Sequence, residues 1–167
     1  DKNNVIAKYN EVGYRDATIE SDTTYINSDN TMTIEMTINE GSPYKFGKIT
    51  FVGNTVYSSE ELSVQLGIKE DDIFNQNVLD SRLFGSADGT DVSSLYLDDG
   101  YLFFNATPIE ITVTEKKIDL EVRIYEGKQA RINKVLVKGN TKTNDHVIMR
   151  ELRTRPGDLF KRSDIMR

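Results

Sequence analysis

The chain has 167 residues with no cysteine and a single histidine, which excludes disulfides, thiol nucleophiles and cysteine–zinc sites. Hydrophobic residues make up 37% and charged residues 29% of the sequence, as expected for one ordinary folded domain or two small ones. The net charge of −6 argues against nucleic acid as the main partner, and no apolar run approaches the roughly 18–20 residues of a membrane-spanning helix. The first residues lack an apolar signal core, so we expect any export signal to be removed or never present.

The first forty residues predict one helix followed by two strands. Met32, Ile34, Met36 and Ile38 alternate with polar residues, which is typical of a strand with one buried face. Residues 44–52 predict the next strand, and the Gly53-Asn54 turn ends it.

Two helical regions follow that strand. Ser58 or Ser59 is suited to cap a helix that ends near Leu66, with Gly67 as its C-cap. Residues 75–99 carry apolar residues at helical spacing, and the glycine-containing segment 85–89 interrupts them.

Two strands complete this part of the chain, at residues 103–113 and 118–124. The predicted fold class is therefore α+β, with β-α-α-β-β modules in which two helices cover one face of a three-stranded mixed sheet. Pro108 cannot donate a ladder hydrogen bond, which favours an edge position for residues 103–113.

An internal repeat at an offset of 86 or 87 residues sets the predicted organisation. Gly53-Asn54-Thr55 recurs as Gly139-Asn140-Thr141, and Glu40-Gly41 recurs as Glu126-Gly127. Residues 9–14 correspond in the same way to residues 96–101. We predict the C-terminal part of one module in residues 1–40 and a complete module in 41–126. Residues 127–167 are predicted to be the N-terminal part of another module, with its first strand and helices.

The C-terminal part of the chain is basic. Residues 128–167 carry eleven Lys and Arg against four Asp and Glu, a net +7, whereas the remainder carries −13. This gradient predicts contact with an anionic surface, such as phospholipid headgroups, although a solvated basic face explains it equally well. The candidate contact residues are Arg150, Arg153, Arg155, Lys161 and Arg162.

The ordered motifs resemble the POTRA repeat. They are a strand ending in Gly53-Asn54, the segment Leu95-Tyr96 with Gly100-Tyr101, and a strand closing on Glu126-Gly127. POTRA repeats form the periplasmic arm of outer-membrane β-barrel assembly factors. The resemblance implies that residues 41–126 are the penultimate repeat and 127–167 the start of the last one. It also implies a location at the periplasmic face of the outer membrane of a Gram-negative cell, with a membrane-embedded barrel in the full-length protein.

As partners, the resemblance implies unfolded outer-membrane proteins and accessory lipoproteins. An edge strand can accept an extended peptide by β-augmentation, because its outer N–H and C=O groups are unpaired. The alternatives are an edge merely protected by its proline and charges, a spacer arm without substrate contact, and the arm of a related secretion transporter. The candidate docking residues are Phe103, Asn105, Thr107, Ile109, Ile111 and Thr112.

Catalytic, metal and cofactor sites are not expected. The lone His146 leaves no material for a Ser-His-Asp set. Asp88, Asp91, Asp98 and Asp99 lack EF-hand spacing, which favours a surface loop over a calcium site. We therefore predict no enzymatic activity. The terminal half-modules are complementary, which predicts one further property. Residues 127–167 of one molecule could complete residues 1–40 of another, so the chain would self-associate.

Overall fold

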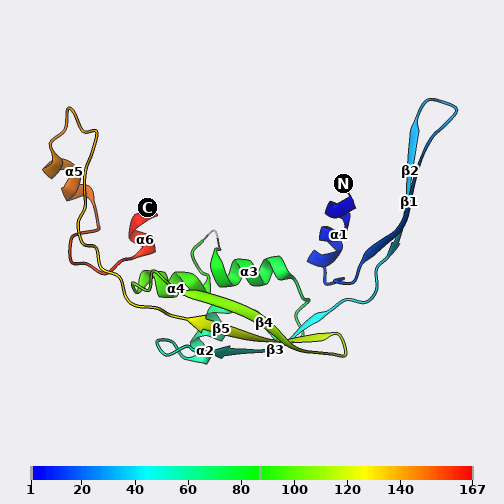
Figure 1. Cartoon of the computed structure of the whole chain (residues 1–167), viewed down its shortest axis with the longest axis horizontal. Coiled ribbons are helices and arrows are strands. Elements are labelled where there is room, and N and C mark those ends of the chain that lie inside the picture. Colours follow the sequence, from blue (N-terminus) through cyan, green and yellow to red (C-terminus); the bar gives the residue numbers. More distant parts are fainter. Residues whose placement is uncertain (1, 87, 167) are drawn as a thin grey trace. The chain divides into compact units, whose positions relative to one another are not determined.

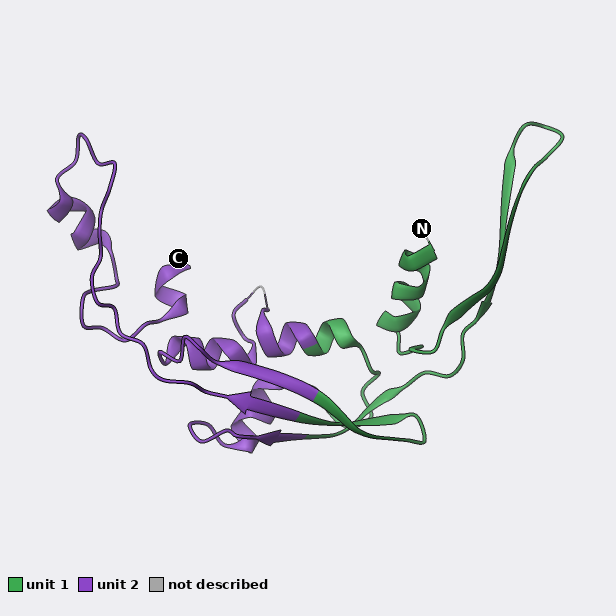
Figure 2. Cartoon of the chain, viewed as in Figure 1, with its two compact units in different colours: residues 1–49, 68–79, 109–121 green, residues 50–67, 80–108, 122–167 purple. Residues whose placement is uncertain are grey.

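The computed structural model describes residues 2–86 and 88–166, which form two compact units. Of these described residues, the first unit comprises those within 1–49, 68–79 and 109–121, and the second comprises those within 50–67, 80–108 and 122–167 (Figure 2). The strands form a two-stranded sheet, β1-β2, and a three-stranded mixed sheet in the order β3-β5-β4 (Figure 1).

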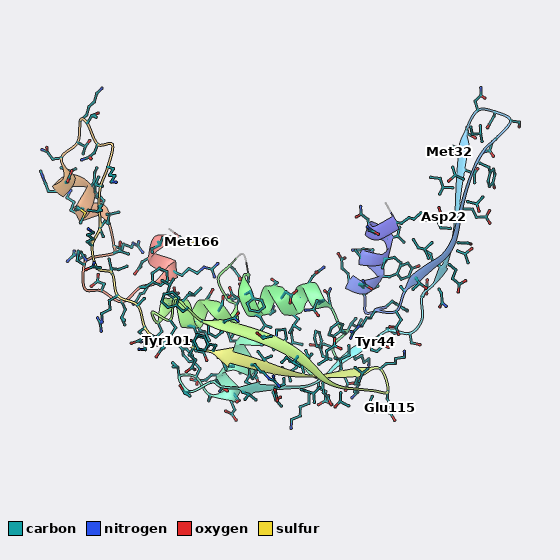
Figure 3. The ribbon with its side chains drawn as sticks, in the orientation of Figure 1. Asp22, Met32, Tyr44, Tyr101, Glu115 and Met166 are labelled. Carbon is teal, nitrogen blue, oxygen red and sulfur yellow. The ribbon has the colours of Figure 1, made fainter. Side chains whose placement is uncertain are left out.

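The N-terminal segment forms the predicted helix and two strands. Helix α1 (Lys2–Glu11) precedes β1 (Thr18–Ile26) and β2 (Met32–Asn39), which pair antiparallel from Ile26↔Met32 to Thr18↔Asn39. The apolar side chains along this ladder are largely exposed, as Figure 3 shows for Met32. The alternating pattern therefore predicts the strands correctly, but not burial of their apolar face within the described chain.

The three-stranded sheet has β5 (Lys117–Tyr125) at its centre, between β3 (Lys45–Val52) and β4 (Asn105–Thr114). Strand β5 buries every second side chain, so one face of the sheet is covered, as predicted. A two-residue turn at Glu115 and Lys116 joins β4 to β5, and both turn residues have positive φ. The buried side chains of β5 are Ile118, Leu120, Val122 and Ile124.

The helices between β3 and β4 confirm the predicted capping chemistry. Helix α2 (Ser59–Leu66) begins with a capping box between Ser58 and Glu61, and ends at left-handed Gly67. The second helical region consists of two helices, α3 (Gln76–Phe84) and α4 (Val92–Asp98). The glycine-containing interruption predicted at residues 85–89 lies between them, with residue 87 outside the described part.

The C-terminal segment contains helices α5 (Asp145–Glu151) and α6 (Arg162–Ile165). The strand expected there, equivalent to β3, was predicted wrongly, because residues 132–138 have no strand assignment. A strand needs a ladder to a neighbour, and the described part of this segment provides only the isolated bridge Arg131↔Leu159. Among the described residues, no helix is long and apolar enough to span a membrane.

Candidate functional site

The two edges of the three-stranded sheet differ. The outer side of β3 is covered at its start by the segment before α3. There the Phe46 amide donates to the Asp72 carbonyl at 2.8 Å, and the Phe74 amide donates to the Tyr44 carbonyl at 2.9 Å. Within the described residues, β4 pairs only with β5. Strand β4 is therefore an edge strand, as its proline predicted.

The predicted docking residues lie along or just before β4. Asn105, Thr107 and Thr112 are exposed, and Ile109 is half-buried. The sequence did not foresee that Ile111 is 55% exposed, nor that Val113 is 50% exposed. These two apolar side chains are accessible on the edge strand itself.

Phe103 lies outside the strand that the sequence assigned to it. Strand β4 begins at Asn105, two residues later than predicted, and Phe103 is 65% exposed. Its neighbour Phe104 instead stacks on the buried ring of Tyr96, with ring centroids 4.2 Å apart. The stacked rings of Tyr96 and Phe104 thus belong to the core, while Phe103 remains accessible beside the start of the β4 edge.

A small pocket flanks β4 in the first unit. Arg15 Nη1 donates to Glu110 Oε1 at 2.7 Å, and the guanidinium lies 5.9 Å from the ring centroid of Phe74. The pocket has a volume of about 200 Å³ and is lined by these three residues together with Asn10 and Gln76. Sequence reasoning missed this ion pair because its partners are 95 residues apart.

The repeat motifs converge on the carboxylate of Glu126 in the second unit. Both backbone amides after the Gly53-Asn54 turn donate to it, Thr55 at 2.7 Å and Val56 at 2.9 Å, and the Thr55 hydroxyl also donates. The hydroxyl of fully buried Tyr96 donates at 3.2 Å. The Glu126 carboxylate therefore joins the end of β5 to the turn after β3 and to α4.

The charge of Glu126 is stabilised by these donors. Partial burial raises its pKa, but hydrogen bonds from the Thr55 hydroxyl, the two amides and Tyr96 outweigh burial and hold the pKa below its ordinary value. Burial and the adjacent Glu126 charge raise the pKa of the Tyr96 hydroxyl. The Tyr–Glu pair recurs at the repeat offset, because the Tyr9 hydroxyl donates to Glu40 at 2.8 Å. The recurrence of the tyrosine and of the Glu-Gly pair at the repeat offset could have predicted this pairing.

Four of the five candidate basic residues, Arg150, Arg153, Arg155 and Lys161, are exposed. Arg162 is engaged elsewhere, because its Nη1 lies 3.7 Å from Oδ2 of the fully buried Asp91. Sequence reasoning placed Asp91 in a surface loop, and this was wrong. Asp91 caps α4 through the Ser94 amide and accepts the hydroxyls of Ser93 and Ser94.

The part of the chain that is described holds no group of three or more residues suited to bind a metal ion. His146, the only histidine, is exposed in the first turn of α5. The accessible groups include the outer backbone edge of β4 and the exposed basic side chains of the C-terminal segment.

The central sheet is mixed, with a β-hairpin at one edge and helices between its first two strands. The Gly-Asn and Glu-Gly motifs of this unit recur in the flanking segments. These features define the class of the protein as a tandem α+β repeat. The chain belongs to the POTRA family, because the family model described as "Surface antigen variable number repeat" matches residues 44–127 and 130–167.

Curated relatives and a solved structure agree with this family. A Treponema pallidum protein, provisionally named an outer membrane protein assembly factor, is 31% identical over 98% of this chain. BamA, the outer membrane protein assembly factor of Nitratidesulfovibrio vulgaris, is 31% identical over 93% of it. The chain spans 20% and 19% of these two relatives. The crystal structure of Haemophilus influenzae BamA POTRA3-5 shares the fold, with a TM-score of 0.65, 19% identity, and coverage of 96% of this chain and 62% of that one.

Proposed function

We propose that this chain is a stretch of the periplasmic arm of an outer-membrane protein assembly factor. In this role, β4 accepts extended segments of unfolded outer-membrane proteins by β-augmentation. The full-length protein would carry a membrane-embedded barrel, and accessory lipoproteins would bind the same arm. The names of the assembly-factor relatives and the POTRA matches support the assembly role.

The open edge of β4 is the observation that carries the docking proposal. Backbone pairing depends little on side-chain identity, which suits a receptor for many different barrel strands. Residues 71–74 cover the start of β3, so β4 is the less obstructed of the two edges. Exposed Ile111 and Val113 would contact alternate side chains of an incoming strand.

Proline substitution tests backbone docking directly. Adjacent strand residues direct their N–H groups to opposite sides, so only one of Ile111→Pro and Thr112→Pro removes an outward donor without breaking the β4–β5 ladder. The variant whose thermal unfolding changes least should bind a synthetic barrel-strand peptide about five- to tenfold more weakly, because a ladder hydrogen bond contributes roughly 1 kcal/mol. Fluorescence anisotropy of the labelled peptide measures this affinity.

Ile111→Thr is the matched control, because it keeps the N–H group and the strand propensity while removing apolar surface. It should bind the peptide within about twofold of the parent chain. A photo-crosslinker at Thr107 should also form adducts with the peptide. Unchanged affinity in the better-folded proline variant, together with no adducts at Thr107, would favour a spacer arm instead.

A further inference from the structure

A backbone contact recurs where consecutive repeats meet. At the first joint, the Gly13 carbonyl accepts the amide of Tyr44 at 2.8 Å, and the Tyr44 carbonyl accepts the amide of Phe74 at 2.9 Å. These two bonds join the turn after α1 to the start of β3. They also join the start of β3 to the segment before α3.

The second joint, formed by residues 91–100 with 129–163, has the same bonds. The Gly100 carbonyl accepts the amide of Ala130 at 2.7 Å, and the Ala130 carbonyl accepts that of Phe160 at 3.0 Å. Gly100 has a φ of +85°, and an added Cβ would lie 3.2 Å from the Leu159 side chain. A glycine is therefore needed here for both backbone conformation and close approach.

The second joint also has side-chain contacts from α4. The Asp98 carboxylate accepts the backbone amide of Ser163 at 2.8 Å. Arg162 Nη1 donates to Ser94 Oγ at 3.1 Å and forms an ion pair with Asp91. Asp91 is held in place by its own α4 cap and is 0% exposed, so the guanidinium meets a fixed, solvent-excluded carboxylate.

The equivalent side chains at the first joint have other roles. Asn75 accepts the amide of Val78 and so supplies the first turn of α3 from within its own repeat. At the repeat offset, the position of Asn75 is occupied by Lys161, whose ammonium group cannot accept a hydrogen bond. In the first turn of α6, the carboxylate of Asp98, in the preceding repeat, supplies an acceptor for the Ser163 amide.

We propose that Asp98 and Asp91 form a neighbour-specific docking site for the following repeat and fix its orientation at the second joint. At the first joint, a different side chain links the two repeats, because Asn75 Nδ2 donates to the Glu11 backbone carbonyl at 2.9 Å. The surface of α4 thus binds a following repeat that has an arginine at position 162 and no hydrogen-bond acceptor in the side chain at position 161.

The absence of cysteine allows paired spin labels to be placed without background. Labels at the exposed positions Glu60 and Lys142 report the distance across the second joint by electron–electron double resonance. Asp98→Ala should at least double the width of the distance distribution. It should also speed amide hydrogen exchange at Ser163 about five- to tenfold, as expected for loss of a helix cap.

Three variants separate docking from other effects. Asp98→Asn keeps an acceptor oxygen and should preserve the narrow distribution of label distances. Asp99→Ala should preserve it too, because it removes only a neighbouring charge and keeps the Asp99 backbone carbonyl that accepts from Gln129. In the Asp98→Ala/Lys161→Asn variant, the new acceptor can reach the amide of Ser163 or Asp164 and should restore slow exchange in this turn, but not the narrow distribution.

Two results would overturn the proposal. One is a double variant that recovers both readouts, because Asp98 would then act only as a helix cap. The other is a single Asp98→Ala variant whose distance distribution is unchanged.

Discussion

Replacement of Glu126 tests whether the recurring motifs form one structural site. Glu126→Ala leaves the amides of Thr55 and Val56 and the buried Tyr96 hydroxyl without their acceptor. Each lost charge-assisted hydrogen bond costs about 1.5–3 kcal/mol in a buried setting, but this carboxylate is only half-buried and its bonds are not additive. We therefore expect a loss of about 2 kcal/mol for Glu126→Ala, and of about 1 kcal/mol for Glu126→Gln.

Urea unfolding followed by circular dichroism measures both losses. With an m-value of roughly 1–3 kcal/mol per molar urea, the midpoint for Glu126→Ala should fall by about 1 M at neutral pH. The slope should be unchanged if only stability is affected. A midpoint within 0.2 M of the parent (roughly the error of the assay) would refute the structural role of the carboxylate.

The pH dependence gives a second check with a defined sign. The folded-state pKa of Glu126 lies below its ordinary value of 4.5, so its stabilising effect is fully present above about pH 4.5. The effect is lost as the pH falls through the lowered folded-state pKa. The stability difference between the parent chain and Glu126→Gln should therefore shrink on acidification below pH 4.5. A difference that grows would contradict the assigned hydrogen bonds.

Two further substitutions test local structure. Ser58→Ala removes the N-cap of α2 and should lower the free energy of unfolding by about 1 kcal/mol, measured by urea titration with exposed Ser63→Ala as the comparison. Glu115→Asn, at a turn position with a φ of +50°, should raise it by about 0.5 kcal/mol, because asparagine tolerates the left-handed region better; an unchanged or lower thermal midpoint would contradict this.

Local signals were sufficient to predict most of the central repeat. Helix α2 follows from Ser58 and Gly67, whose capping preferences act over a few residues. The edge position of β4 follows from Pro108, because a missing N–H group is incompatible with pairing on both sides. The recurring Gly-Asn and Glu-Gly pairs were found from the sequence because a repeat preserves their spacing.

Tertiary contacts between distant residues were not predictable in the same way. Asp91 lies in a polar, loop-like segment, yet it is fully buried, because three serines and Arg162 satisfy its carboxylate. The failed strand prediction at residues 132–138 has a similar origin. Side-chain alternation indicates a preference for extended structure, but a sheet forms only where a second strand supplies the ladder.

Coverage of the β3 edge by residues 71–74 has a consequence for aggregation. A sheet that polymerises must present two open sides, one to join the previous molecule and one to receive the next. The short pairing of residues 71–74 against the start of β3 obstructs one of those sides. Edge-to-edge pairing of copies, with β4 of one molecule against β3 of the next, is therefore disfavoured, which lowers the tendency of this repeat to form a fibril.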